Sequence, residues 1–179
     1  MRACLAQHCD IEKMMEICEE NLLENNREKF SANDFSNKGF LLTRLTSQNV
    51  QEMIDDKKNY VVLVAKDGDK IMGYLIACDI EKVDYELREK IKELKNFRGK
   101  VFYHKQIVKK LGVKQVGEKL LLSMLDEVNN RGYSHVVCRI VHEPFYNQAS
   151  ISFHQKFGFS QVGLYKKNEV LTGIYLKDL

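Results

Sequence analysis

The spacing of hydrophobic residues predicts two helical regions in the first third of the chain. After a short strand-like run at residues 2–5, apolar residues recur at helical spacing between Ile11 and Leu22, which predicts an amphipathic helix. A second apolar set covers residues 40–54 and predicts another helical region, with a break near Ser47. Both apolar stripes are typical of core-facing helices.

A hairpin is the clearest local prediction of the pattern. The runs YVVLVA and KIMGYLIAC have the composition of strands, and they flank a turn that contains Asp67 and Gly68. An Asp-Gly pair suits a tight turn because glycine adopts positive φ at little cost. We therefore expect two antiparallel strands at 60–65 and 70–78.

The second half of the chain alternates helices and strands. Residues 84–95 are highly charged around a narrow apolar stripe of Leu87, Ile91 and Leu94, which predicts a solvated surface helix that is weakly docked. The remaining predicted elements are strands at 101–108, 134–141, 161–165 and 170–176 and helices at 116–130 and 147–157. This order predicts an α/β (α+β) fold with a mixed sheet of about six to seven strands flanked by helices.

Composition indicates one compact domain spanning residues 1–179. The chain is 44% hydrophobic and contains one Pro and ten Gly, without a low-complexity segment. Its net charge of +3 comes from interleaved acids and bases, so we expect no nucleic-acid partner. No apolar run reaches membrane-spanning length and the N-terminus is too polar for a signal peptide, so we expect a cytoplasmic protein without a membrane partner.

The cysteines indicate reduced thiols rather than disulfides or a metal site. They are five in number, scattered, and without a CxxC pair. Cys4, His8 and Cys9 have the residue types of half a metal site, but no second half follows at ligand spacing. The sequence therefore predicts no metal.

Two segments carry candidate chemistry. In the first, a strand leads into a basic loop with Gly112 and then into a helix that begins near Val116; such a helix start binds phosphate, although an ordinary solvated loop has the same pattern. In the second, Asn147 begins a short helix that Gly158 ends, with Phe153 and Phe157 on one face. A polar side chain at that start either caps the helix or holds a ligand.

Together these segments resemble the GCN5-related N-acetyltransferase (GNAT) superfamily. In that family a strand, a pyrophosphate loop, a helix, a second strand and an Asn-containing helix ending in Gly-Phe bind acetyl-CoA, and the order of elements here is similar throughout. The resemblance implies the GNAT fold, with Asn147 and Ser150 facing the pantetheine arm. The cofactor-binding residues it implies are Ile107, Val108, Lys109, Val113, Lys114, Gln115, Val116, Gly117, Glu118, Asn147, Ser150 and Phe153.

This chain departs from the family pattern in two places. When Gly117 is set on the last glycine of the loop motif, Gly112 takes the usual Arg/Gln position and Gln115 stands where glycine is usual. His154 stands seven residues after Asn147, where many members place a Tyr that protonates the leaving thiolate.

The implied reaction needs a base and an acid. A primary amine with a pKa near 10.4 must lose a proton before it attacks a thioester. His142 and Glu143, at the end of the strand before Asn147, are the candidate bases, and the backbone near Ile107 and Val108 is the candidate oxyanion site.

His154 is the candidate acid, with a packed structural histidine as the alternative. Tyr103 and His104 are weaker candidates, because strand alternation places only one of them toward the cleft.

We therefore predict an acetyl-CoA-dependent N-acetyltransferase that acts by direct transfer in a ternary complex. The alternative is an acyl-CoA-binding or protein-interaction module that kept the fold and lost turnover. The absence of a G-x-S-x-G nucleophile elbow argues against a hydrolase. The expected partner is a small-molecule or peptide amine, and the sequence leaves open a homodimer with a second copy of the chain.

Overall fold

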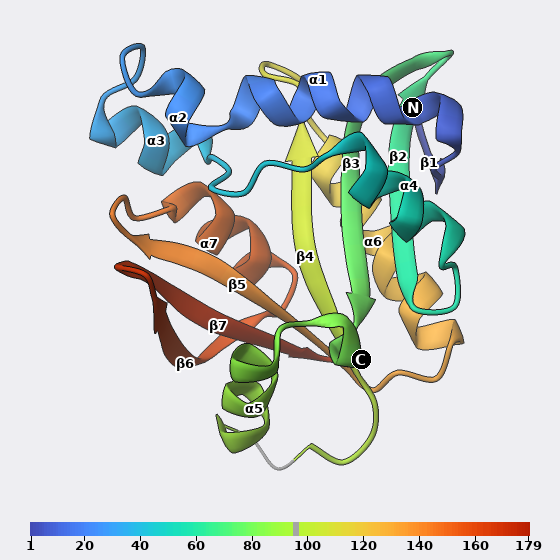
Figure 1. Ribbon diagram of the computed structural model, residues 1–179, viewed down its shortest axis with the longest axis vertical. Coiled ribbons are helices and arrows are strands. Elements are labelled where there is room, and N and C mark those ends of the chain that lie inside the picture. Colours follow the sequence, from blue (N-terminus) through green and yellow to red (C-terminus); the bar gives the residue numbers. More distant parts are fainter. Residues whose placement is uncertain (95–96) are drawn as a thin grey trace.

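The computed structural model describes residues 1–94 and 97–179, so Lys95, the predicted end of the charged helix, lies outside the described residues. The described residues form a seven-stranded mixed sheet in the order β1-β2-β3-β4-β5-β7-β6 (Figure 1). The strands are β1 Arg2–Leu5, β2 Tyr60–Asp67, β3 Lys70–Asp79, β4 Val101–Lys109, β5 His135–Glu143, β6 Ser160–Lys167 and β7 Val170–Asp178. The predicted mixed sheet is confirmed.

Strand pairing includes the predicted hairpin of β2 and β3 and a second hairpin, formed by the predicted strands at 161–165 and 170–176. β2 pairs antiparallel with β3 through a turn where Gly68 has φ +57°, and β6 pairs antiparallel with β7. Among the described strands, β4 and β5 form the one parallel pair, because helix α6, Val116–Asn130, connects them as a crossover. The centre of the sheet is therefore the place where two neighbouring strands run in the same direction, whereas the other described neighbours are antiparallel.

Helices cover both faces of the sheet (Figure 1). On one face lie α1, Ile11–Asn21, and α4, Ser47–Asp55, whose apolar sides pack on β2 and β3. On the other lie α6 and α7, Gln148–Lys156, with α6 residues such as Leu120 and Met124 fully buried. None of the helices in the described part of the chain is long and apolar enough to cross a membrane.

Residues 40–46 are not helical, which corrects the prediction for this region. Helix α3, Ala32–Lys38, precedes them and ends at Gly39, whose φ of +76° stops the helix. Leu41 then forms an isolated parallel bridge with Leu22, just before α2, Leu23–Asn26. In this extended segment Phe40 and Leu45 are buried, Leu41 is half-buried and Leu42 is exposed. The hydrophobic spacing of so short a run does not distinguish an extended segment from a helix.

Helix α5, Tyr85–Leu94, is docked more firmly than its charge pattern predicts. Leu87 and Ile91 are each only 1% exposed and lie in a core cluster with Tyr103, Ile174 and other residues of the sheet. Gly163 on β6 has no side chain, and a Cβ there would lie 2.5 Å from Leu94. The whole narrow apolar stripe of α5 therefore packs against the sheet, and the expectation of weak docking is wrong.

We expect Leu87→Ala to lower the free energy of unfolding by about 2–4 kcal/mol, because it leaves a cavity under α5. The matched control is Leu122→Ala on α6, where the leucine is 44% exposed, and its effect should stay within about 0.5 kcal/mol. Urea denaturation of both variants measures this. Equal, small losses would show that α5 is not part of the cooperative core.

Candidate functional site

Strands β4 and β5 lie side by side for only part of their length (Figure 1). Their pairing runs from Val101 opposite His135 to His104 opposite Cys138. Beyond this point β4 continues on β3 and β5 continues on β7, so residues 105–109 and 139–143 form no ladder with one another in the described structure. Backbone groups along this gap need other partners, which a ligand can supply.

Two cavities in the described part of the molecule meet at this gap. The strand-side cavity, of about 470 Å³, lies between β4, β5 and the wall at 40–43. The loop-side cavity, of about 710 Å³, lies between the end of β4, the loop 110–115, the start of α6 and α7. The residues that line both, which we call the junction, are Phe40, Leu41, Ile107, Asn147 and Ser150.

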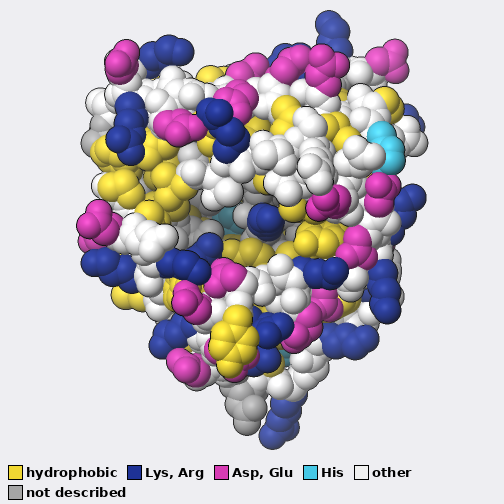
Figure 2. Space-filling view, in the orientation of Figure 1, with side chains coloured by type: hydrophobic (Ala, Val, Ile, Leu, Met, Phe, Trp, Pro, Cys, Tyr) yellow, Lys and Arg dark blue, Asp and Glu magenta, His cyan; other side chains and the backbone are white. Residues whose placement is uncertain are grey.

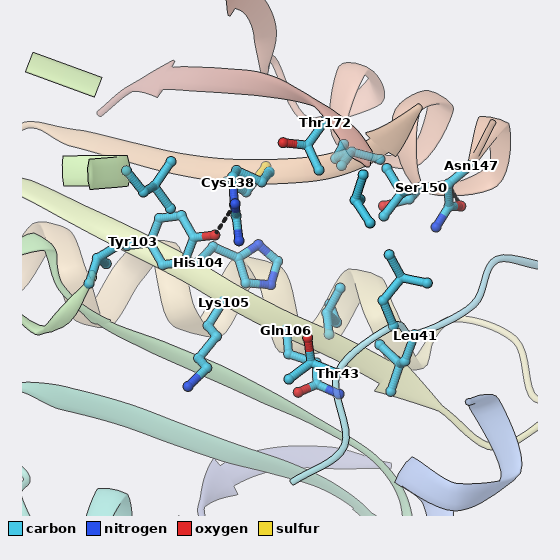
Figure 3. A pocket seen from close by; sticks show the side chains of 18 of the residues that line it. Leu41, Thr43, Tyr103, His104, Lys105, Gln106, Cys138, Asn147, Ser150 and Thr172 are labelled. Atoms are coloured by element: carbon cyan, nitrogen blue, oxygen red, sulfur yellow. Dashed lines mark hydrogen bonds between the residues drawn. The ribbon is translucent and has the colours of Figure 1, made fainter. Parts of the chain in front are cut away.

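The space-filling view shows the hollow in the middle of one face, with basic and histidine side chains inside it (Figure 2). The close-up shows Asn147 and Ser150 at one end of the strand-side cavity and Tyr103 toward the other, with His104 between them and Lys105 extending from β4 away from these residues (Figure 3). The polar groups of the cavity thus come from β4, from β5 and from the start of α7.

The loop before α6 presents a helix N-terminus to the loop-side cavity. Gln115 has φ +63° and ψ −2°, a left-handed conformation that favours glycine, so glycine is the residue that this backbone accepts most easily. In the described residues no side chain caps α6, which leaves its first N–H groups and the positive end of its dipole for an anion.

The structure brings most of the predicted cofactor-binding residues together. Those that line the loop-side cavity are Ile107, Val108, Lys109, Gln115, Gly117, Glu118, Asn147, Ser150 and Phe153. Val113 and Val116 instead pack their side chains into the core, and the Lys114 side chain is exposed. Gly117 allows the close approach of α6 to α7, because a Cβ there would lie 3.3 Å from Phe153 Cζ.

Asn147 caps α7 and faces the junction. Its Oδ1 accepts a hydrogen bond from Ser150 N at 3.1 Å, and only 6% of the residue is exposed. The backbone N–H of Asn147 donates to Val141 O at 3.0 Å, which fixes the helix start to the end of β5. The cap satisfies the carbonyl oxygen and leaves the amide NH₂ as the group that can meet a ligand.

His154 and His104 form a buried pair behind the junction. His154 Nδ1 lies 2.7 Å from Ser150 O, and because a carbonyl only accepts, Nδ1 carries the proton. His154 Nε2 then accepts from His104 Nδ1 at 3.3 Å. This order of donors leaves a lone pair on His104 Nε2, which is buried and has no hydrogen-bond partner in the described residues.

Burial keeps both rings neutral. It lowers the pKa of His154 to about 4, and burial together with the neighbouring His154 lowers the pKa of His104 well below its ordinary value. At neutral pH the pair is therefore an uncharged hydrogen-bonded unit with fixed tautomers. In this structure His154 donates its Nδ1 proton in a hydrogen bond to the Ser150 carbonyl. The acid role predicted for His154 remains a prediction.

His142 and Glu143 lie outside both cavities. Val141 lines the strand-side cavity, so strand alternation turns His142 to the other face, where its Nε2 is 3.1 Å from Tyr175 Oη. Glu143 is exposed at a register shift near the end of β5. The structure therefore does not bring these two side chains to the cavities, and their role as base stays a prediction.

A model of the acetyltransferase (GNAT) family matches residues 23–159, which is more than half of the chain. The chain belongs to this family. A search of curated protein sequences gave no match.

Solved structures of acetyltransferases share the fold at low sequence identity. Ribosomal-protein-alanine N-acetyltransferase from Brucella melitensis is 17% identical with a TM-score of 0.69, and 100% of each chain is covered. A putative acetyltransferase from Salmonella typhimurium, solved with its cofactor acetyl-CoA, is 19% identical with a TM-score of 0.67 over 99% of this chain and 93% of that one. An N-acetyltransferase from Thermoplasma acidophilum in complex with coenzyme A is 13% identical with a TM-score of 0.67, over 99% and 98%.

Sequence reasoning missed much of the strand-side cavity of this acetyltransferase. Tyr103 and His104 both line it, against the expectation that alternation selects one. Tyr103 packs with α5 and His104 contacts His154 of α7, so the cavity in the gap between β4 and β5 reaches side chains of both faces. A register shift between β4 and β3 makes Lys105 the extra residue of a bulge. Lys105 and Arg139 line it as well, and nothing in their local sequence distinguishes them from other strand cations. A bulge is a tertiary feature, so the period-2 pattern alone does not reveal it.

The neutral histidine pair predicts a pH-dependent stability. Below pH 6.5 the unfolded chain protonates His154, whereas the folded chain resists until about pH 4, so the free energy of unfolding should fall as pH drops through this window. The loss due to His154 is on the order of 3 kcal/mol. Above pH 6.5 this contribution is constant.

The measurement is urea denaturation at pH 7.0 and 5.0 for the native chain and for His154→Gln. The variant should be less stable at pH 7 and should lose less stability on acidification. If the free energy of unfolding fell by the same amount from pH 7.0 to pH 5.0 in both proteins, the result would contradict the buried neutral state of His154.

Proposed function

We propose that this chain transfers an acetyl group from acetyl-CoA to a primary amine, directly and within a ternary complex. The observation that supports this most is the meeting of two cavities at the junction, where β4 leaves β5. One substrate in each cavity would place its reacting end at Ile107, Asn147 and Ser150. Direct transfer then needs no nucleophilic side chain, which agrees with the absence of a nucleophile elbow.

The loop-side cavity fits the charge of coenzyme A. Its phosphates are anionic, and the cavity offers the uncapped start of α6 together with Lys38, Lys109 and Lys156. Lys156 pairs with Glu118 at 3.5 Å and Lys38 with Asp34 at 3.0 Å, which leaves Lys109 as the lining lysine without an ion pair in the described residues. These groups would hold the phosphates at the α6 end of the cavity.

The same cavity fits the arm that joins the phosphates to the thioester. Phe153 and the half-exposed Leu111 offer apolar surface. The edge of β4 that does not pair with β5 offers backbone N–H and C=O groups to the amides of the arm. Asn147 would orient the end of the arm through its side-chain NH₂. When bound, acetyl-CoA supplies the thioester that the amine attacks.

The strand-side cavity would receive the amine in its neutral form. Lys105 and Arg139 make this cavity cationic, and positive charge disfavours an ammonium group more than an amine. His104 lines the cavity, but its Nε2 is fully buried, so its lone pair is not presented to the amine. Because its pKa lies well below the ordinary value, His104 would border the amine as a neutral ring and would not hold its proton.

Ser150 is the group we propose to face the departing sulfur. It lines both cavities, and its Oγ lies 3.4 Å from His154 Nδ1 and so beside the buried pair. In this arrangement His154 positions the start of α7 and the Ser150 hydroxyl donates a hydrogen bond to the thiolate. This hydrogen bond would stabilise the thiolate in place of the acid predicted for His154, because the neutral imidazole has no proton to give at pH 7.

A second candidate is an acyl-CoA-binding module without turnover. It is favoured by the neutral, hydrogen-bonded state of His154, which stands where many family members place a Tyr. Saturable binding of acetyl-CoA without thioester loss across a broad amine panel would support it over the transferase.

Calorimetry with acetyl-CoA tests the cofactor proposal. The native chain should bind saturably, and Gly117→Val should weaken binding by about tenfold or more, because the new side chain would displace Phe153 and disturb the start of α6. Asp126→Val, at an exposed position of the same helix, is the matched control and should bind as the native chain does. No binding at millimolar acetyl-CoA would overturn the proposed function.

Attack by a neutral amine predicts a rising pH–rate profile. For an acceptor with a pKa near 10.4, kcat/KM should increase about tenfold per pH unit between pH 7 and 9, because the deprotonated fraction does so. Thioester loss at saturating acetyl-CoA measures this. A flat profile would show that the chain itself holds an efficient base, and that His104 or another group takes the proton.

A further inference from the structure

The charged side chains that line the strand-side cavity fall into two groups. Lys82 pairs with Asp56 at 2.9 Å, and Lys167 pairs with Asp84 at 3.4 Å and with Glu86 at 3.0 Å. Lys105 and Arg139 line the same cavity, and neither forms an ion pair within residues 1–94 and 97–179. Two uncompensated cations therefore line a cavity that we assign to the acceptor.

Arg139 is held in one orientation by its neighbours. Its Nε donates to Tyr103 Oη at 3.2 Å, and its guanidinium lies 5.2 Å from the centre of the Tyr165 ring. These contacts use the Nε side and one face of the group, and the structure gives its two Nη atoms no hydrogen-bond partner among the described residues. A half-buried, preorganised guanidinium fork fits the two oxygens of a carboxylate.

Lys105 stands at the edge of the cavity, at a backbone irregularity. The register of β3 with β4 joins Ile76 to Gln106 and Ala77 to His104, so Lys105 is the extra residue of a bulge. Figure 3 shows its side chain extending from β4 beside the cavity. The bulge therefore adds an exposed positive charge on the same side as Arg139.

Both cations lie close to the junction along their strands. Lys105 precedes the junction residue Ile107 by two residues on β4. Arg139 precedes Val141 by two residues on β5, and the Val141 carbonyl accepts from the backbone N–H of the junction residue Asn147. Two residues span about 6.6 Å along a strand. A substrate whose amine reaches the junction would thus place a group a few bonds away within reach of these side chains.

We propose that the acceptor is a small primary amine that carries a carboxylate a few bonds from its nitrogen, as a free amino acid does. This inference rests on the proposed function and names the substrate class of the same site. The carboxylate binds the Arg139 fork, Lys105 adds charge, and the amine points toward Ile107. The two cations also favour the neutral form of the amine, so one pair of side chains serves orientation and reactivity.

The test compares matched acceptors at saturating acetyl-CoA. Each of several amino acids is assayed beside its carboxamide and its decarboxylated amine, and kcat/KM is measured from thioester loss. Because every rate is corrected for the deprotonated fraction of that acceptor, differences report recognition of the carboxylate. We expect the amino acids to be preferred by about ten- to a hundredfold, the range of a hydrogen-bonded charge pair.

Variants assign this preference to the two cations. Arg139→Gln and Lys105→Gln should each reduce the preference for the amino acid over its decarboxylated amine, mainly by raising KM for the amino acid. Arg139→Lys, which keeps the charge and loses the fork, should recover part of it. Lys70→Gln, an exposed position at the β2–β3 turn, removes the same charge elsewhere and should leave the preference unchanged.

The outcomes separate this inference from the proposed function. Turnover of the decarboxylated amines and carboxamides at least as fast as the amino acids would overturn the carboxylate proposal and leave the transferase intact. Preference for a peptide with an acidic side chain over every free amino acid would overturn the small-molecule assignment. If the native chain did not bind acetyl-CoA, the proposed function itself would be overturned.

Discussion

Beyond His104 and Cys138, β4 and β5 have no hydrogen-bond ladder between them, because each strand keeps a different antiparallel neighbour. Unpaired backbone groups are costly when water cannot reach them, so the gap stays accessible or is filled by a ligand. Both cavities exist because of this divergence, and their shared residues lie at its mouth. A parallel pair that continued to the strand ends would leave no place for two substrates to meet.

The buried histidines connect this gap to the helix that closes it. His154 belongs to α7 and His104 to β4, and their contact ties the helix to the strand on the far side of the opening. Because the Ser150 carbonyl fixes one tautomer, the hydrogen bonds have a single direction that ends in the lone pair of His104 Nε2. Such a pair fixes geometry without adding charge, which leaves the cations of the strand-side cavity to set its potential.

Two walls of the site are built by segments whose local pattern is ambiguous. Residues 40–43 have an apolar run that fits a helix or an extended wall, and the bridge of Leu41 with Leu22 selects the wall. Helix α5 has few apolar residues, yet Leu87 contributes both to the core and to the lining of the strand-side cavity. The shape of the acceptor cavity therefore depends on packing between segments far apart in the chain.

Local sequence determined the elements with strong periodicity or special turn chemistry. The β2–β3 hairpin follows from two strand-like runs around Gly68, and α6 follows from a long apolar stripe. Gly158, with φ +85°, ends α7 as its position predicts, and Asn147 caps it. These features depend on neighbours within a few residues, and the order of elements with the two motif segments was enough to indicate the family.

Tertiary structure alone decided which side chains share the site. His142 and Glu143 stand beside Asn147 in the sequence, but alternation and a register shift turn them away from the cavities. Lys105 stands at the edge of the site because a bulge changes the direction of one residue, and Arg139 enters because β5 leaves β4 at that point. Such placements depend on strand register and strand separation, which arise from contacts across the sheet and therefore have no signature in the local order of residues.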